Sequence, residues 1–138
     1  IANYFNAEMV ICDKHRKRAN EIASMVVIGD VTGKDIVIID DICDTGGTLA
    51  KSAALLKEKG ARSVRALITH PVLSGKAYEN IENSVLEELV VCDTIPMKQE
   101  SKKIKVISVS ELFAYAIRNA FENKSITSLF IHSQRRDK

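Results

Sequence analysis

Residues 36–48 read IVIIDDICDTGGT and carry the side chains of this chain that are best suited to chemistry. The apolar, β-branched run 36–39 predicts a parallel strand that is buried on both faces. Asp40 and Asp41 follow where this strand is expected to end, and open α/β sheets hold their ligands at that carboxyl edge. The pattern therefore predicts a ligand site at the end of the strand.

Segment 44–48 (DTGGT) has the composition of a phosphate-binding turn. Gly46 and Gly47 allow the backbone to curl around an anion, because a Cβ at either position would hold a phosphate away. Thr45 and Thr48 add hydroxyl donors, and Thr48 is expected to cap the helix that follows. The alternative is an ordinary strand-to-helix turn with solvated acids. Three acids beside a Gly-Gly turn have no evident structural purpose, which favours the functional interpretation.

The length and composition limit the classes of protein to which the chain can belong. The 138 residues suffice for one domain, with 46% hydrophobic and 28% charged residues as in soluble globular proteins. A net charge of +2 and 5% aromatic residues argue against a nucleic-acid partner, and no apolar stretch reaches the length of a membrane span. Cys12, Cys43 and Cys92 form no disulfide or zinc pattern, so a reducing, cytoplasmic location is expected. We expect Cys12 and Cys92 to be buried, and Cys43 to be exposed with its thiolate disfavoured by neighbouring acids.

Strands and helices are expected to alternate, which predicts an α/β fold with a mostly parallel sheet flanked by helices. The apolar stripe of the last helix predicts a core or subunit-interface role, and Ser110 is expected to cap that helix. The expected elements are a helix end at 1–6, strands at 8–12 and 25–28 around a loop at 13–24, a strand at 36–40, a helix at 48–59 ending at Gly60, a strand at 63–69 broken by His70-Pro71, a short helix near 75–82, and strands at 87–92 and 104–108 before a helix at 110–122.

The motif 36–48 resembles the phosphoribosyl-pyrophosphate binding motif of the type I phosphoribosyltransferase fold. That motif alone leaves open a base phosphoribosyltransferase and a synthetase that makes the pyrophosphate donor. Further segments, in this order and spacing, resemble the C-terminal half of ribose-phosphate diphosphokinase of the phosphate-activated class. They are 11–20 (ICDKHRKRAN), 69–75 (THPVLSG), 90–96 (VVCDTIP) and 125–130 (SITSLF).

The resemblance implies a C-terminal phosphoribosyltransferase-like domain, residues 1–138, of a longer two-domain enzyme that is truncated at its N-terminus. That enzyme transfers the diphosphoryl group of ATP to the 1-hydroxyl of ribose 5-phosphate, with Mg²⁺ and with inorganic phosphate as activator. ATP would bind mostly through the missing N-terminal domain, so the chain alone is expected to be inactive. The family implies a cytoplasmic homo-oligomer, a hexamer, with neither nucleic acid nor membrane as partner.

Within that resemblance, the ribose 5-phosphate site is expected in segment 40–48. The phosphate would lie against Thr45, Gly46, Gly47 and Thr48. Asp40 and Asp41 would repel a phosphate, but they suit ribose hydroxyls and a hydrated Mg²⁺. Successive strand residues point to opposite faces, so only one of these two acids is expected to face the sugar. Asp44 is expected to cap the amides of its own loop or to contact the ribose.

Three further groups take their roles from the resemblance. In the flexible catalytic loop, 13–24, Lys14 and Arg16 match the functional basic residues and would stabilise charge on the transferring diphosphoryl group. Ser125, Thr127 and Phe130 match a region that contributes to a regulatory phosphate and ADP site. For His70, a structural role in the turn and a role in binding the substrate are equally expected. A non-catalytic regulatory relative is the remaining alternative, against which Lys14 and Arg16 argue.

Overall fold

The computed structural model describes residues 2–15 and 24–130. These residues form two compact units: Val10–Ile107, and a smaller unit of residues from Ile1–Met9 and Ser108–Lys138. Among the described residues, no helix is both long enough and apolar enough to cross a membrane.

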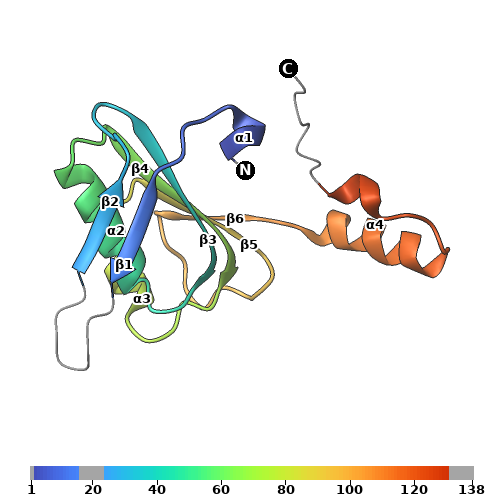
Figure 1. The fold of residues 1–138 in the computed structure, drawn as a ribbon. Coiled ribbons are helices and arrows are strands. Elements are labelled where there is room, and N and C mark those ends of the chain that lie inside the picture. Colours follow the sequence, from blue (N-terminus) through green and yellow to red (C-terminus); the bar gives the residue numbers. More distant parts are fainter. Residues whose placement is uncertain (1, 16–23, 131–138) are drawn as a thin grey trace, which may run out of the picture. The chain divides into compact units, whose positions relative to one another are not determined.

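The larger unit contains a four-stranded parallel sheet in the order β3-β4-β5-β6 (Figure 1). An antiparallel hairpin of β1 and β2 lies beside it as a separate two-stranded sheet. The expected α/β fold with a mostly parallel sheet is therefore confirmed. The elements are β1 (Ile11–His15), β2 (Ser24–Ile28), β3 (Asp35–Cys43), α2 (Gly47–Glu58), β4 (Ser63–Pro71), α3 (Ala77–Glu82), β5 (Glu88–Cys92) and β6 (Ile104–Ile107).

The core of this unit lies between one face of the sheet and the helices α2 and α3. Alternate residues of β4 are buried, beginning with Val64, and they join Leu56 of α2 and Ile81 of α3 in one apolar cluster. The opposite face of the sheet is exposed: Val37 is 48% and Ile39 is 45% exposed. The expectation that segment 36–39 is buried on both faces was therefore wrong. Both crossover helices cover the same face, as right-handed connections between strands taken in sequential order require.

Two strands run further than the sequence pattern indicated. β3 continues to Cys43, so Asp40 and Asp41 lie within the strand, and β4 continues through His70 to Pro71. Pro71, which has no N–H to donate, is the last residue of β4 and lies beyond the part of the strand that pairs with β5, since that pairing ends at Ile68.

Helix ends also differ from two expectations. Gly60 follows α2 with a φ of 94°, as expected for a glycine after a helix. The N-cap of α2 is Gly46 and no side chain caps it; Thr48 already lies in the first turn, so its capping role was wrong.

The smaller unit consists of α1 (Ala2–Phe5), α4 (Ser110–Phe121) and the 3₁₀ helix η1 (Thr127–Leu129). Ser110 is the first helical residue of α4 and not its cap, because the N-cap is Val109 and no side chain caps the helix. The backbone N–H of Ser110 donates to the Ser108 hydroxyl. The apolar stripe of α4 is exposed, with Phe121 at 88%, so the described residues give it no core role. The interface alternative stays a prediction.

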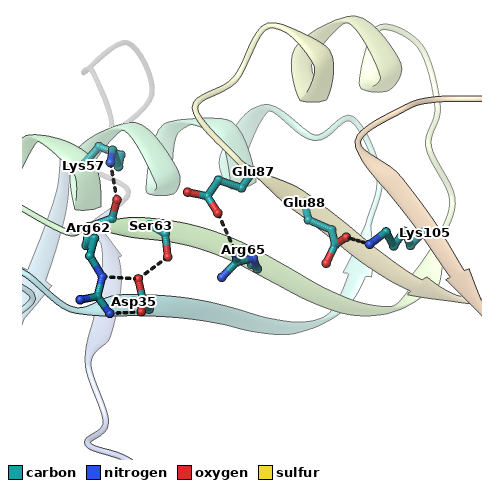
Figure 2. A network of polar contacts seen from close by, with 8 residues as sticks. All are labelled: Asp35, Lys57, Arg62, Ser63, Arg65, Glu87, Glu88 and Lys105. Atoms are coloured by element: carbon teal, nitrogen blue, oxygen red, sulfur yellow. Dashed lines mark hydrogen bonds and ion pairs between the residues drawn. The ribbon is translucent and has the colours of Figure 1, made fainter.

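The amino edge of the parallel sheet carries a network of ion pairs and hydrogen bonds (Figure 2). Asp35, the first residue of β3, accepts a 2.8 Å hydrogen bond from Arg62 Nε and a 2.6 Å bond from the Ser63 hydroxyl. Further along the same edge, Arg65 pairs with Glu87 at 2.6 Å. This network joins the beginnings of β3 and β4 at the edge opposite the acidic turn.

Asp35 makes this edge sensitive to acid. The hydrogen bonds from Arg62 and then Ser63 hold the pKa of the Asp35 carboxyl well below its ordinary value of 3.8. The ionised pair therefore stabilises the fold above that ordinary value, and the stabilisation is lost as the pH falls below it. Asp35→Asn should modestly lower the melting temperature at pH 7, and the difference from the melting temperature of the unmodified chain should narrow progressively as the pH falls below 3.8. Glu100→Gln, an exposed carboxylate outside the network, is the control. A gap that stays constant with pH would contradict this account.

Candidate functional site

The carboxyl edge of the sheet brings the acidic turn next to the start of α2. Asp40 and Asp41 are exposed near the end of β3, and the backbone N–H of Asp41 donates to Asp40 Oδ1 at 2.9 Å. Segment 44–46 then leads directly into α2 at Gly47. A helix start of this kind directs several N–H groups and the positive end of its dipole towards a ligand. The arrangement is suited to an anion beside two carboxylates.

Gly46 is required by the fold itself. Its φ of 70° lies in the left-handed region, and a Cβ there would come within 3.3 Å of the Ala77 carbonyl oxygen and 3.4 Å of Ile81. Gly47 differs, because its Cβ would come no closer than 3.8 Å, to Thr45 Oγ1. Only the first of the two glycines is therefore demanded by packing. The role of the second in admitting a phosphate stays a prediction.

A second chain segment, which follows β4, donates hydrogen bonds to residues of the turn. Ser74 donates its hydroxyl hydrogen bond to the Asp44 carboxylate, and its backbone N–H donates to the Asp44 carbonyl at 3.0 Å. Asn80 of α3 donates to the carbonyl of Thr45 at 2.8 Å. Asp44 is thus fixed by a hydroxyl from another loop, a contact that sequence reasoning missed together with Asn80.

Cys43 is buried at the base of this turn and is 4% exposed. Burial raises the pKa of its thiol and is the largest effect; the Gly46 backbone N–H opposes it, and the carboxylates of Asp44 and Asp40 add smaller increases. The expected disfavoured thiolate is confirmed and the expected exposure was wrong. The burial expected of Cys12 was also wrong, since that residue is exposed, while Cys92 is half-buried.

Asp40 and Asp41 are the candidate metal ligands at this edge. Among the described residues, no group of three or more His, Cys, Asp and Glu side chains is placed to hold a metal ion. Mg²⁺ is commonly held by one or two carboxylates together with waters and substrate phosphates, and therefore needs no larger protein cluster. The two acids fit that mode, so their role as metal ligands remains a prediction.

Other expected site residues lie outside this turn. Lys14 belongs to β1, opposite Met25, and so does not lie in a loop; Arg16 and the rest of the basic segment fall outside the described residues. Ser125 and Thr127 belong to the smaller unit, where their hydroxyls are 2.8 Å apart. Phe130 in the same unit is 61% exposed.

The fold defines an α/β domain of the type I phosphoribosyltransferase kind, with the glycine turn between β3 and α2. Comparison with known proteins identifies the family within this fold class. Residues 7–131 match the family model described as "Phosphoribosyl synthetase-associated domain". The chain belongs to this family.

Individual relatives agree with the family assignment. The chain is 55% identical over 130 residues to a ribose-phosphate pyrophosphokinase of Wolinella succinogenes, covering 94% of this chain and 42% of that protein. It is 53% identical over 131 residues to the enzyme of that name from Campylobacter jejuni, covering 95% of this chain and again 42% of the relative. The structure is similar to a phosphoribosylpyrophosphate synthetase from Mycobacterium smegmatis, with a TM-score of 0.72 and 38% identity over 80% of this chain and 36% of that one. The chain thus spans less than half the length of these relatives.

Proposed function

We propose that this chain is the C-terminal domain of a longer, two-domain ribose-phosphate pyrophosphokinase and that it supplies the ribose 5-phosphate site. The observation that carries the proposal is the turn between β3 and α2, where Gly46 and the N-terminus of a twelve-residue helix lie beside two exposed carboxylates. The identities of 53% to 55% to enzymes of that name support the same activity.

The proposed chemistry assigns each group a task that suits its charge. The 5-phosphate would accept hydrogen bonds from the backbone of 45–48 and from the hydroxyls of Thr45 and Thr48. Asp40 and Asp41 would accept hydrogen bonds from ribose hydroxyls, and one of them would bind Mg²⁺. The metal, when bound, would neutralise charge on the transferring diphosphoryl group.

Other groups of this chain, together with the other domain, would complete the catalytic and regulatory sites. Lys14 and Arg16 would stabilise the developing charge on the diphosphoryl group and on AMP as it leaves. ATP would bind mostly to the other domain. The enzyme would be a cytoplasmic hexamer that inorganic phosphate activates, with Ser125, Thr127 and Phe130 contributing to the regulatory site.

The assignment of the ribose 5-phosphate site to this chain and of the ATP site to the other domain can be tested by measuring AMP release from ATP. The full-length enzyme should release AMP only when ribose 5-phosphate and Mg²⁺ are present. The isolated 138-residue chain should release none, and should bind ribose 5-phosphate weakly or not at all. AMP release by the isolated chain that depends on the sugar phosphate would contradict the assignment of the ATP site to another domain. A full-length enzyme that needs no ribose 5-phosphate would overturn the proposed function.

A further inference from the structure

His70 connects the ends of two neighbouring strands at the carboxyl edge. It lies in β4 next to Ile42 of β3, one residue beyond Asp41, with paired backbones about 5 Å apart. On its other side, its Nδ1 lies 3.0 Å from the hydroxyl of Thr94, in the turn that follows β5. The half-buried ring therefore lies between the acidic end of β3 and the turn after β5.

The hydrogen bonds of Thr94 determine which nitrogen of His70 carries the proton. The Thr94 hydroxyl donates to the carbonyl of Thr69 at 2.9 Å, and a carbonyl oxygen can only accept. A hydroxyl has one hydrogen, so towards His70 it must act as an acceptor. Nδ1 is therefore the protonated nitrogen, and Nε2 of the neutral ring carries the free lone pair.

The position of the ring also indicates where that lone pair is available. Nε2 lies on the side of the ring away from Nδ1, and hence away from Thr94 and the turn after β5. By alternation along the paired strands, His70 shares its face of the sheet with Ile42 and Asp40, whereas Asp41 belongs to the opposite face. Asp40 is therefore the acid of β3 that lies on the same side of the sheet as the ring. An acceptor at that edge complements a ligand that offers hydroxyl donors.

We infer that His70 is a further substrate-binding residue, whose Nε2 accepts a hydrogen bond from the 2- or 3-hydroxyl of the bound ribose 5-phosphate. The inference rests on the proposed function, because it takes its ligand from it. Thr94 acts as a positioning residue: it holds the ring in the tautomer that leaves Nε2 an acceptor. Without that hydroxyl, either ring nitrogen can carry the proton and part of the population presents a donor.

Steady-state kinetics of the full-length enzyme test this inference with His70→Asn. The asparagine amide retains a donor for Thr94 but has no atom at the position of Nε2. We expect the KM for ribose 5-phosphate to rise about tenfold, as for the loss of one hydrogen bond, with kcat changed less than about threefold. Thr94→Val should also raise this KM, and Thr94→Ser should restore it.

Deoxy sugars separate hydroxyl binding from a structural effect. Affinity is measured by competition with 2-deoxyribose 5-phosphate and 3-deoxyribose 5-phosphate against the unmodified enzyme, His70→Asn and Thr94→Val. For the analogue that lacks the bound hydroxyl, both substitutions should change affinity less than about twofold, while the other analogue should keep the tenfold effect. Equal effects on ribose 5-phosphate and on both analogues, or no effect on any, overturn the inference. The proposed function fails separately, if the unmodified enzyme releases no AMP with ribose 5-phosphate.

Discussion

Replacing Lys14 by alanine in the full-length enzyme is expected to lower kcat by about 10²- to 10³-fold, as for the loss of one charged group that stabilises a transition state. The KM for ribose 5-phosphate should change less than about threefold, because the proposed partner of Lys14 is the transferring diphosphoryl group and not the sugar phosphate. Rates of AMP formation at saturating ATP, with ribose 5-phosphate varied, measure both parameters.

Lys17→Ala is the matched control, because it removes the same charge from the same basic segment. It should change kcat less than about threefold, since a charge that contributes only to the background field is screened by salt. Equal losses for the two variants would assign the effect to net charge and not to a positioned Lys14. An unchanged rate for Lys14→Ala would remove that residue from the catalytic groups.

Gly46→Ala should damage both the fold and the binding of the sugar phosphate. The left-handed backbone, with a φ of 70°, costs a residue with a Cβ about 1–2 kcal/mol, and the new methyl group would crowd the Ala77 carbonyl oxygen at 3.3 Å. A turn that shifts to relieve this contact misplaces its N–H groups. The loss of one or two charge-assisted hydrogen bonds would raise the KM for ribose 5-phosphate by about 10- to 100-fold.

Gly33→Ala provides the matched comparison for this prediction. Gly33 has nearly the same backbone angle, with a φ of 67°, but nothing lies within 4 Å of the position that the new methyl group would take. Gly33→Ala should lower the free energy of unfolding by the backbone strain alone, and it should leave the KM for ribose 5-phosphate unchanged. Urea unfolding of both variants, with the kinetics above, separates strain from crowding. If the two variants lose equal stability and both keep the KM, the contact with Ala77 has no role in shaping the turn.

Much of the fold could be predicted from the sequence, because its signals are local. The apolar run before Asp40 indicated a strand, Gly60 marked the end of α2, and the alternation of elements indicated a parallel sheet. The exposed face of β3 could not be predicted in the same way. Val37 and Ile39 have the composition of buried residues, and their exposure depends on where the crossover helices lie.

The candidate site was predicted where its residues are adjacent in the chain and missed where they are distant. Residues 40–48 lie together at the carboxyl edge because one strand, one turn and one helix carry them. Ser74 and Asn80 reach the same turn from positions 30 and 35 residues away from their partners. Neither a serine before glycine nor an asparagine in a short helix distinguishes a supporting contact from an ordinary surface residue.

The support of the turn by Ser74 and Asn80 has a consequence for protein engineering. The segment IVIIDDICDTGGT would not carry its shape into a foreign scaffold, because the crossing segment that holds Asp44 and Thr45 would stay behind. The smallest transplantable piece is the whole β3-α2-β4-α3 stretch, from Asp35 to Glu82. Designers who borrow this turn must therefore graft a crossover unit together with its neighbour.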